Sequence, residues 1–459
     1  MKSPLRGKQS PHSEVECRLT TTLARIAEIA RAQPTIRFTS LAHLIDIEML
    51  KQCHDEQKVK RAAGVDGVTK VEYERNLETH LVNLHQRLRN QAYKPQPVRR
   101  TYIPKPGSDK RRPLGIPAYE DKLVQSAISK ILTAIFEADF LDTSYGFRPQ
   151  RGAHDALKTL NHLFITKKIN YVVDADIMGF FDHVDHQWLM KFLGHRIADK
   201  TLLRLIYRFL KAGIMEEGAW RESGSGTPQG GLVSPILANL YLHYSLDLWF
   251  EKSVRKQCVG KAYMIRYADD FVCCFQYQQD AVRFHAALQK RLGKFALTIA
   301  EDKTKIVEFG RFAKQHCAPP SKPATFDFLG FTHYCGESYQ GKFRVKRRTS
   351  QKKFRASLER MKIWIRENRT RPAAELMHEL TRKLQGYYQF YGITDNGPRL
   401  YEFFYHVKWA LFKWLNRRGQ RKSFDAVKFN LFLAKFPLPA PKIHVNIMDF
   451  RVSPAYFRE

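Results

Sequence analysis

Residues 262–275 read AYMIRYADDFVCCF, with two adjacent aspartates, Asp269 and Asp270, in the middle of an apolar segment. Apolar, aromatic and β-branched residues mostly alternate on both sides of the pair, which predicts two strands joined by a tight turn. Neighbouring carboxylates repel each other and are costly to desolvate unless a positive charge is present. Hard divalent cations prefer carboxylate oxygen. The pair therefore indicates either a metal site or a solvated Asp-Asp turn.

A second acidic segment lies upstream, where residues 171–186 read YVVDADIMGFFDHVDH. Asp174 and Asp176 are two residues apart in a predicted strand, so they share one face of it. A strand that ends in acids opposite an acidic hairpin would supply the carboxylates that two-metal phosphoryl transfer needs. Between the two segments, residues 224–239 read GSGTPQGGLVSPILAN, a glycine-rich loop that leads into an apolar helix expected at 236–250. Such a loop lets the backbone approach a nucleotide or a template closely.

The order of these segments, with the motifs DIxxFFDxxxH, TPQGGxxSPxLxN and YADD, resembles the palm of a reverse transcriptase. The finer resemblance is to group II intron reverse transcriptases, also called maturases, and it covers residues 60–415. Four further segments agree with it: AAGVDGVT (62–69), RRPLGIP (111–117), SYGFRPQRGAHDAL (144–157) and FDFLGF (326–331). The last of these is a short apolar strand with Gly330, which we interpret as the hairpin that grips the primer. The resemblance implies an α+β fold, a right-hand polymerase with fingers and an antiparallel palm sheet, followed by an α-helical thumb.

The composition favours a polyanionic partner. The chain has 77 Lys and Arg against 45 Asp and Glu, a net charge of +32, which indicates nucleic acid first and a membrane surface second. No apolar run of membrane-spanning length and no secretory signal is found, so we expect no membrane partner.

The seven cysteines form no CxxC pair, which is typical of a reduced cytosolic protein. We expect a cytoplasmic location, in the bacterial cytosol and associated with the nucleoid.

The segments divide the chain into five expected parts. After Cys335 no cysteine occurs, so we expect the appended zinc nuclease of many family members, and target cleavage, to be absent. The tail holds nine Lys and Arg and three acids, which suits a DNA-binding segment or a docking strap. The five parts are a basic N-terminal leader (1–44) with a helix near 20–32, an N-terminal extension and fingers (45–165), a palm with the catalytic aspartates (166–340), a helical thumb or maturase domain X (341–416) and the basic tail (417–459).

The resemblance also implies the ligands of the metal site. Asp176, Asp269 and Asp270 would bind two Mg²⁺ ions through their carboxylates, with Mn²⁺ as a substitute. The backbone carbonyl of Ile177 is an expected further ligand, and Asp174 competes with Asp176 for the same role.

Lys303 best matches the lysine that protonates the leaving pyrophosphate in polymerases of this type. A strand is expected at 297–300, just before this lysine. The family usually has Asn three residues before the lysine, whereas this chain has Ala300.

The nucleotide should lie between the fingers and the palm. Residues 93–117 read as a basic strand pair, in which Arg112 best matches the fingers residue that grips the triphosphate and Lys105 is the second match. Contact of this hairpin with template phosphates is the other interpretation.

Phe181 matches the position under the nucleotide sugar, where an aromatic ring would exclude a ribose 2′-hydroxyl. Packing of both Phe180 and Phe181 in the core is the alternative. The shape of Gln229 suits a hydrogen bond to a nucleotide or a template base, and Asn239 is expected to face the nucleotide.

Further basic residues are expected to contact nucleic acid. Arg148 and Arg151 flank a Pro-Gln turn and should meet template or nucleotide. Residues 342–383 hold 15 Lys or Arg and 4 acids, on helices rich in aromatic residues. Apolar residues at i, i+4, i+7 and i+11 predict one buried helix face: Phe354, Leu358, Met361 and Ile365. The expected contacts there are Lys346, Arg347, Arg348, Lys352 and Lys353.

Together these patterns predict an RNA-directed DNA polymerase, a nucleotidyltransferase that copies RNA into cDNA. By resemblance it would also assist the splicing and mobility of its own intron RNA. Its partners would be an intron RNA template, a DNA primer or target, the RNA–DNA hybrid and dNTPs, and it would act as a monomer or a dimer. The alternatives are a domesticated reverse transcriptase in DNA repair or phage defence, and a non-enzymatic RNA-binding splicing factor. Phe181 argues against a plain RNA polymerase.

Overall fold

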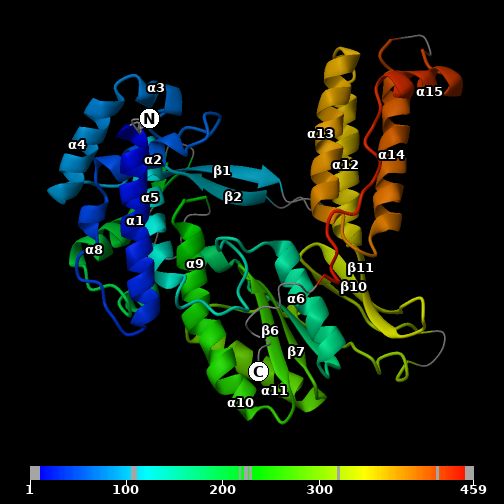
Figure 1. The fold of residues 1–459 in the computed structure, drawn as a ribbon, viewed down its shortest axis with the longest axis horizontal. Coiled ribbons are helices and arrows are strands. Elements are labelled where there is room, and N and C mark those ends of the chain that lie inside the picture. Colours follow the sequence, from blue (N-terminus) through cyan, green and yellow to red (C-terminus); the bar gives the residue numbers. More distant parts are fainter. Residues whose placement is uncertain are drawn as a thin grey trace, which may run out of the picture.

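The computed structural model describes residues 11–104, 111–216, 219–221, 226, 230–317, 321–419 and 423–449, without the side chains of 11–20, 219–221 and 303. Figure 1 shows a helical N-terminal part and a helical C-terminal part that rise on either side of a central sheet. The strand pair β1 (Val98–Pro104) and β2 (Arg111–Ile116) extends from the N-terminal part toward the C-terminal helices (Figure 1). This is the arrangement of fingers, palm and thumb.

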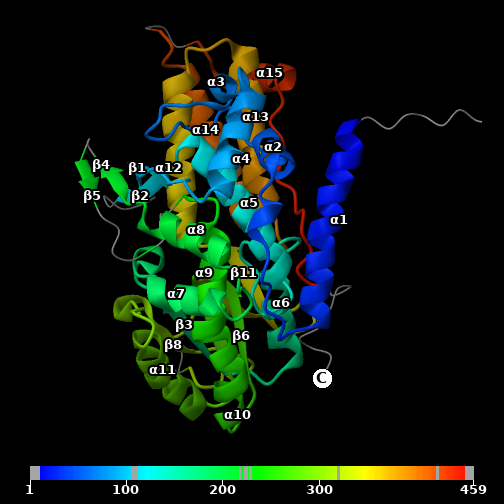
Figure 2. The ribbon, with the colours of Figure 1, turned by 90° about the vertical axis from the view of Figure 1, so that its left-hand side faces the viewer.

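The fingers consist of helices and one small sheet. Asp46 and Thr69 accept hydrogen bonds from backbone N–H groups at the start of α2 and α3, and Thr69 forms a capping box with Glu72. The sheet has the order β2-β1-β4-β5, and β1 and β2 are antiparallel, as the sequence predicted. The other elements are α1 (Pro11–Ala32), which lies along one side in Figure 2, α2 (Ile47–Asp55), α3 (Lys70–Glu74), α4 (Leu77–Arg89), α5 (Tyr119–Phe136), β4 (Ile214–Glu216) and β5 (Ala219–Arg221).

The palm is an antiparallel sheet with the order β6-β7-β3-β8. Successive residues of its strands alternate between two cores because strand side chains point to opposite faces. Val172 and Cys274 pack with α6 on one face, and Val173 and Cys273 pack with α9 and α11 on the other. The elements are α6 (Ala153–Thr166), β3 (Tyr171–Asp176), α7 (His186–Leu193), α9 (Ser234–Leu242), β6 (Ala262–Tyr267), β7 (Asp270–Phe275), α11 (Gln278–Gly293) and β8 (Lys305–Glu308). The helix α8 (Lys200–Lys211) leads back to the fingers, where Arg204 and Arg208 donate hydrogen bonds to Gln91.

The thumb follows a three-stranded sheet with the order β11-β10-β9. The predicted apolar face of its first helix is confirmed: Phe354, Leu358, Met361 and Ile365 are all buried in one cluster with α13 and α14. The elements are β9 (Phe326–Phe328), β10 (Phe331–Glu337), β11 (Phe343–Thr349), α12 (Gln351–Asn368), α13 (Ala373–Tyr391), α14 (Gly397–Leu415) and α15 (Ala426–Lys435).

Part of the basic tail docks on the protein. The backbone N–H groups of His444 and Val445 donate to the carbonyl of Gly392 at the end of α13, and Ile447 is fully buried. Asn161 of α6 donates to the carbonyl of Ile447. Residues 443–449 therefore strap the palm to the thumb, while DNA binding by the tail stays a prediction.

Two elements differ from the predictions. The expected strand at 297–300 forms only an isolated bridge between Ile177 and Ile299. The expected helix 236–250 ends as α9 at Leu242 and continues in two π-helical turns, His243–Asp247 and Phe250–Val254. Wider π-turns change which residues face the sheet, and they often occur beside functional sites. Among the described residues, no helix is both long enough and apolar enough to cross a membrane.

Candidate active site

The two adjacent aspartates lie at the end of the palm sheet. Strands β6 and β7 are joined by a two-residue turn, Ala268–Asp269, whose first residue has a φ of 58°. Asp270 is the first residue of β7 and pairs across the ladder with Asp176, the last residue of β3. The three predicted metal ligands therefore meet at one end of the sheet.

The carboxylates at this end oppose one another's ionisation. Burial raises the pKa of Asp270 to about 7, and repulsion from the neighbouring acids adds to the effect. These neighbours are Asp174, Asp269 and Asp176. The backbone N–H of Leu329, in the turn between β9 and β10, donates to the Asp270 carboxylate and partly offsets the shift. The turn after β9 thus contacts the acids directly.

The carboxylate of Asp269, unlike that of Asp270, has cationic side chains near it that lower its pKa. Burial and then the charge of Asp176 raise its pKa, whereas Arg112 and Arg266 act in the opposite direction. Arg112 is exposed on β2. The fold thus brings the predicted triphosphate contact of the fingers within electrostatic range of the palm acids.

Asp174 belongs to the same cluster but faces another element. Its pKa is raised to about 7 by burial, by Asp327 of β9 and by Asp176, and it is lowered by Lys305. Lys305 pairs with Asp174 across β3 and β8. Asp174 therefore has a counterion on the neighbouring strand.

The donor set suits a hard divalent cation. Several half-buried carboxylates repel each other, and a cation would relieve this repulsion. Among the described residues, no three carboxylate, imidazole or thiol groups already form a metal-ligand cluster. The fit therefore rests on the donor chemistry and on the raised pKa values.

The turn Ala268–Asp269, hereafter the catalytic turn, carries a predicted metal ligand and is held in place by a buried arginine. The guanidinium of Arg266 donates to both carboxylate oxygens of Asp247 at 2.7 and 2.5 Å, and both side chains are 0% exposed. It also donates to the carbonyl of Ala268 at 2.8 Å and to Oδ1 of Asn239 at 3.0 Å. Sequence reasoning missed Arg266 and Asp247, although a charged residue inside an apolar strand signals a buried partner.

Asn239 belongs to this network. It is fully buried, and its Nδ2 donates to the carbonyl of Gly146 at 2.7 Å. The expected contact between Asn239 and a nucleotide is wrong for this geometry, because both ends of the amide bind protein groups.

Gly146 explains part of the SYGFRP motif. A Cβ at this position would lie 2.3 Å from the backbone nitrogen of Ala268 and 2.9 Å from the carbonyl carbon of Tyr267. Such distances are not tolerated, so glycine is required where this loop packs on the catalytic turn.

The two phenylalanines after Asp176 have different environments. Phe180 is 2% exposed and belongs to the core, while Phe181 is half-buried at the edge of that core. A Cβ on Gly226 (φ 88°) would lie 2.8 Å from the carbonyl oxygen of Phe181, so the glycine-rich loop passes against this residue. Phe181 packs against the core that contains Phe180, so the core alternative stays open beside the predicted role of Phe181 in sugar selection.

Three of the expected contact side chains lie outside the part of the chain that the structure describes. Lys105 and Gln229 lie outside the described residues, as does the side chain of Lys303. Lys303 ends a short 3-10 helix that follows Ala300, whose N–H donates to the carbonyl of Asp176 at 2.8 Å. The neighbouring Ile177 has a buried side chain, and its role as a carbonyl ligand stays a prediction.

Two predicted nucleic-acid contacts are wrong. The side chain of Arg148 is 2% exposed, pairs with Glu137 and also donates to backbone carbonyls. Arg347 is fully buried, and its guanidinium donates to Oδ1 of Asn161 at 2.9 Å. Neither side chain is available to a phosphate.

The other basic candidates lie nearer the surface. Arg151 is partly exposed and pairs with Asp142 at 2.5 Å. Lys346 is half-buried, and three residues are exposed, namely Arg348, Lys352 and Lys353. Contact of these four thumb-side residues with nucleic acid stays a prediction.

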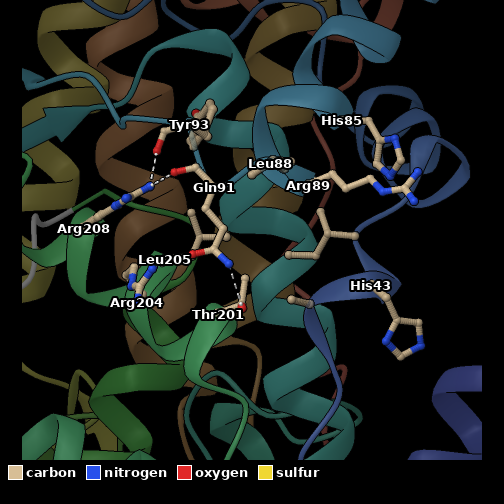
Figure 3. Close-up of a pocket in the computed structure, with 12 residues that line it drawn as sticks. His43, His85, Leu88, Arg89, Gln91, Tyr93, Thr201, Arg204, Leu205 and Arg208 are labelled. Atoms are coloured by element: carbon tan, nitrogen blue, oxygen red, sulfur yellow. Dashed lines mark hydrogen bonds between the residues drawn. The ribbon is translucent and has the colours of Figure 1, made fainter.

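A separate basic cavity of about 410 Å³ lies in the fingers, between α4 and α8 (Figure 3). Of the 12 lining residues drawn there, none is acidic and three are arginines: Arg89, Arg204 and Arg208. Arg208 donates to the carbonyl of Gln91 at 2.7 Å. Helices α4 and α8 lie on the side of the molecule away from the thumb helices (Figure 1), so the cavity between them is separate from the acids.

Comparisons with known proteins agree with this architecture. A family model described as reverse transcriptase (RNA-dependent DNA polymerase) matches residues 103–333, and one described as the group II intron maturase-specific domain matches residues 352–432. Protein YkfC of Escherichia coli K12 is 34% identical over 370 residues, which cover 72% of this chain and 92% of YkfC.

Group II intron-encoded protein LtrA of Lactococcus lactis is 48% identical over 166 residues, which cover 36% of this chain and 27% of LtrA, about a quarter of its length. A solved Candida albicans telomerase, in complex with a fragment of telomeric RNA, has a TM-score of 0.41 and 11% identity. It covers 80% of this chain and 66% of the telomerase chain, a likeness too weak to support an inference. The sequence matches, with the acids at the end of the palm sheet, show that the chain belongs to the reverse transcriptase family of the group II intron type.

Proposed function

We propose that the protein is an RNA-directed DNA polymerase that copies RNA into cDNA. The observation that carries this proposal is the meeting of Asp176, Asp269 and Asp270 at one end of the palm sheet, with raised pKa values for the last two. Acids so arranged suit metal-assisted transfer of a nucleotide to a primer 3′-hydroxyl.

The metal site would be formed by the three carboxylates and the carbonyl of Ile177. When bound, two Mg²⁺ ions, or Mn²⁺ in their place, would activate the 3′-hydroxyl and neutralise charge on the triphosphate. Arg112 would grip the triphosphate, since it is exposed and within electrostatic range of Asp269. Lys303 would supply the proton to the leaving pyrophosphate, and Phe181 would exclude a ribose 2′-hydroxyl.

The chain's RNA partner would be an intron RNA, whose splicing and mobility the protein would assist. The maturase-specific match on the thumb and the exposed basic residues there support this role. The acid-free cavity of the fingers is a second candidate contact for RNA phosphates, because it holds three arginines.

Primer extension on an RNA template, with RNA binding measured in parallel, tests the proposal. The parent protein should make full-length cDNA, whereas the Asp269→Asn variant should bind RNA normally and make none. Tight RNA binding without cDNA from either protein would favour a non-enzymatic splicing factor and overturn the polymerase proposal.

A further inference from the structure

A loop from the fingers side extends the palm sheet up to the catalytic turn. The N–H of Arg266 donates to the carbonyl of Thr143 at 2.8 Å, and the N–H of Tyr145 donates to the carbonyl of Arg266 at 2.9 Å. Residues 143–145 thus run parallel to β6 along its free edge. Phe147 follows directly, at the end of the sheet that carries Asp269.

Phe147 has an unfavourable backbone conformation and a half-exposed side chain. Its φ is 58°, a left-handed value that bulky residues rarely adopt, and the residue is 52% exposed. The residues on both sides fix this conformation: Gly146 packs on the catalytic turn, and Arg148 is held by Glu137 at 2.7 Å. Strain that the surroundings impose in this way concentrates at functional sites.

The position of Phe147 corresponds to the template side of the site. The turn between β9 and β10 reaches Asp270 through the N–H of Leu329, and Asp327 acts on Asp174, which pairs with β8. This turn, predicted to grip the primer, therefore lies over β7 and β3. Phe147 is beside the free edge of β6, on the side of β6 that faces away from β7. A primer held over β7 and β3 leaves the template strand of the duplex toward β6.

We propose that Phe147 forms a stacking site for the template base that is next to be copied. Bases inside a duplex have both faces covered by their neighbours, whereas the first unpaired base has one open face. Exposed aromatic side chains stack on such bases with little dependence on sequence. The site rests on the proposed polymerase function and adds a template contact that the acids, Arg112 and Phe181 do not supply.

A fluorescent base analogue tests this contact without catalysis. 2-Aminopurine would be placed at the first unpaired position of an RNA template annealed to a DNA primer. The parent protein should quench its fluorescence by stacking. Phe147→Ala should lose the quenching, and Phe147→Trp should retain it. Tyr277→Ala is the matched control, because Tyr277 is 47% exposed at the opposite end of the same sheet.

Single-nucleotide addition at limiting dNTP gives a second measurement. Phe147→Ala should be slower than the parent by about tenfold, within the range measured for loss of one base–aromatic stack. Equal quenching and equal rates in parent and Phe147→Ala would overturn the stacking site. A parent protein that binds primer–template and makes no cDNA would instead contradict the proposed function, since the quenching experiment needs no chemistry.

Phe147→Gly separates a local effect from misfolding. Glycine adopts a φ of 58° without strain, so this variant should melt at or above the temperature of the parent and still lose quenching. Retained quenching in Phe147→Gly would contradict the proposal, because the base would then stack without the ring.

Discussion

The buried pair of Arg266 and Asp247 should link the stability of the palm to catalysis. Asp247→Asn leaves the guanidinium of Arg266 buried without a counter-charge, and both side chains are 0% exposed. Removing one partner of a buried ion pair costs about 3–5 kcal/mol. For a domain of 150–250 residues this corresponds to a fall in melting temperature of roughly 6–20 °C.

The double variant Arg266→Met, Asp247→Leu separates the two roles. Replacing a buried pair by apolar residues of similar size is often neutral or stabilising, so thermal stability should recover. The hydrogen bonds from Arg266 to the carbonyl of Ala268 and to Asn239 would still be missing. Nucleotide addition should therefore remain low. Thermal melting and single-nucleotide addition, measured on the same samples, check both effects.

Two results would refute this reasoning. A melting temperature of Asp247→Asn equal to that of the parent would show that the pair contributes nothing to stability. Full recovery of activity in the double variant would show that Arg266 does not position the catalytic turn.

Three further predictions follow from the site. Without divalent cations, the free energy of unfolding should fall as pH rises from about 4 to about 7. Asp270 and Asp174 have pKa values raised to about 7, so the folded protein binds more protons than the unfolded chain in this range. Mg²⁺ should restore the free energy of unfolding above pH 7, and a flat pH profile in urea unfolding would contradict this prediction. Gly146→Ala should abolish nucleotide addition, since the new Cβ would lie 2.3 Å from the backbone nitrogen of Ala268. Gly386→Ala is the control and should be active, because its Cβ would meet nothing within 4 Å. An active Gly146→Ala variant would contradict the contact. Phe181→Ala should admit ribonucleotides, measured as the ratio of rNTP to dNTP incorporation, and an unchanged ratio would exclude Phe181 as the sugar gate.

The acidic hairpin could be predicted from the sequence because its signals are local. Alternating apolar residues on both sides of Asp269 and Asp270 fixed the two strands and the turn, and the order of motifs indicated the palm. The amphipathic face of α12 followed from spacing in the same way, and its four residues are buried as predicted.

Partners of charged residues could not be predicted from composition. Arg148 and Arg347 were counted as basic surface, but Glu137 and Asn161 bind them in the interior. The alternation of side chains along β11 signals the burial of Arg347, because Val345 and Thr349 lie on the same strand face and are also buried. No local pattern links Arg266 to Asp247, since the π-turn at His243–Asp247 determines which side of the helix faces the sheet.

The rate of single-nucleotide addition in Asp176→Asn, beside that in Asp174→Asn, tests the central claim most directly. Asp176 meets Asp270 across the ladder, whereas Asp174 has Lys305 as its counterion. Loss of a metal ligand removes several kcal/mol of charge stabilisation, so Asp176→Asn should be slower than the parent by about 10³-fold or more. Asp174→Asn should be slower by about 10–100-fold at most, as for a residue that supports the ligands. Near-parent activity in Asp176→Asn would contradict the account.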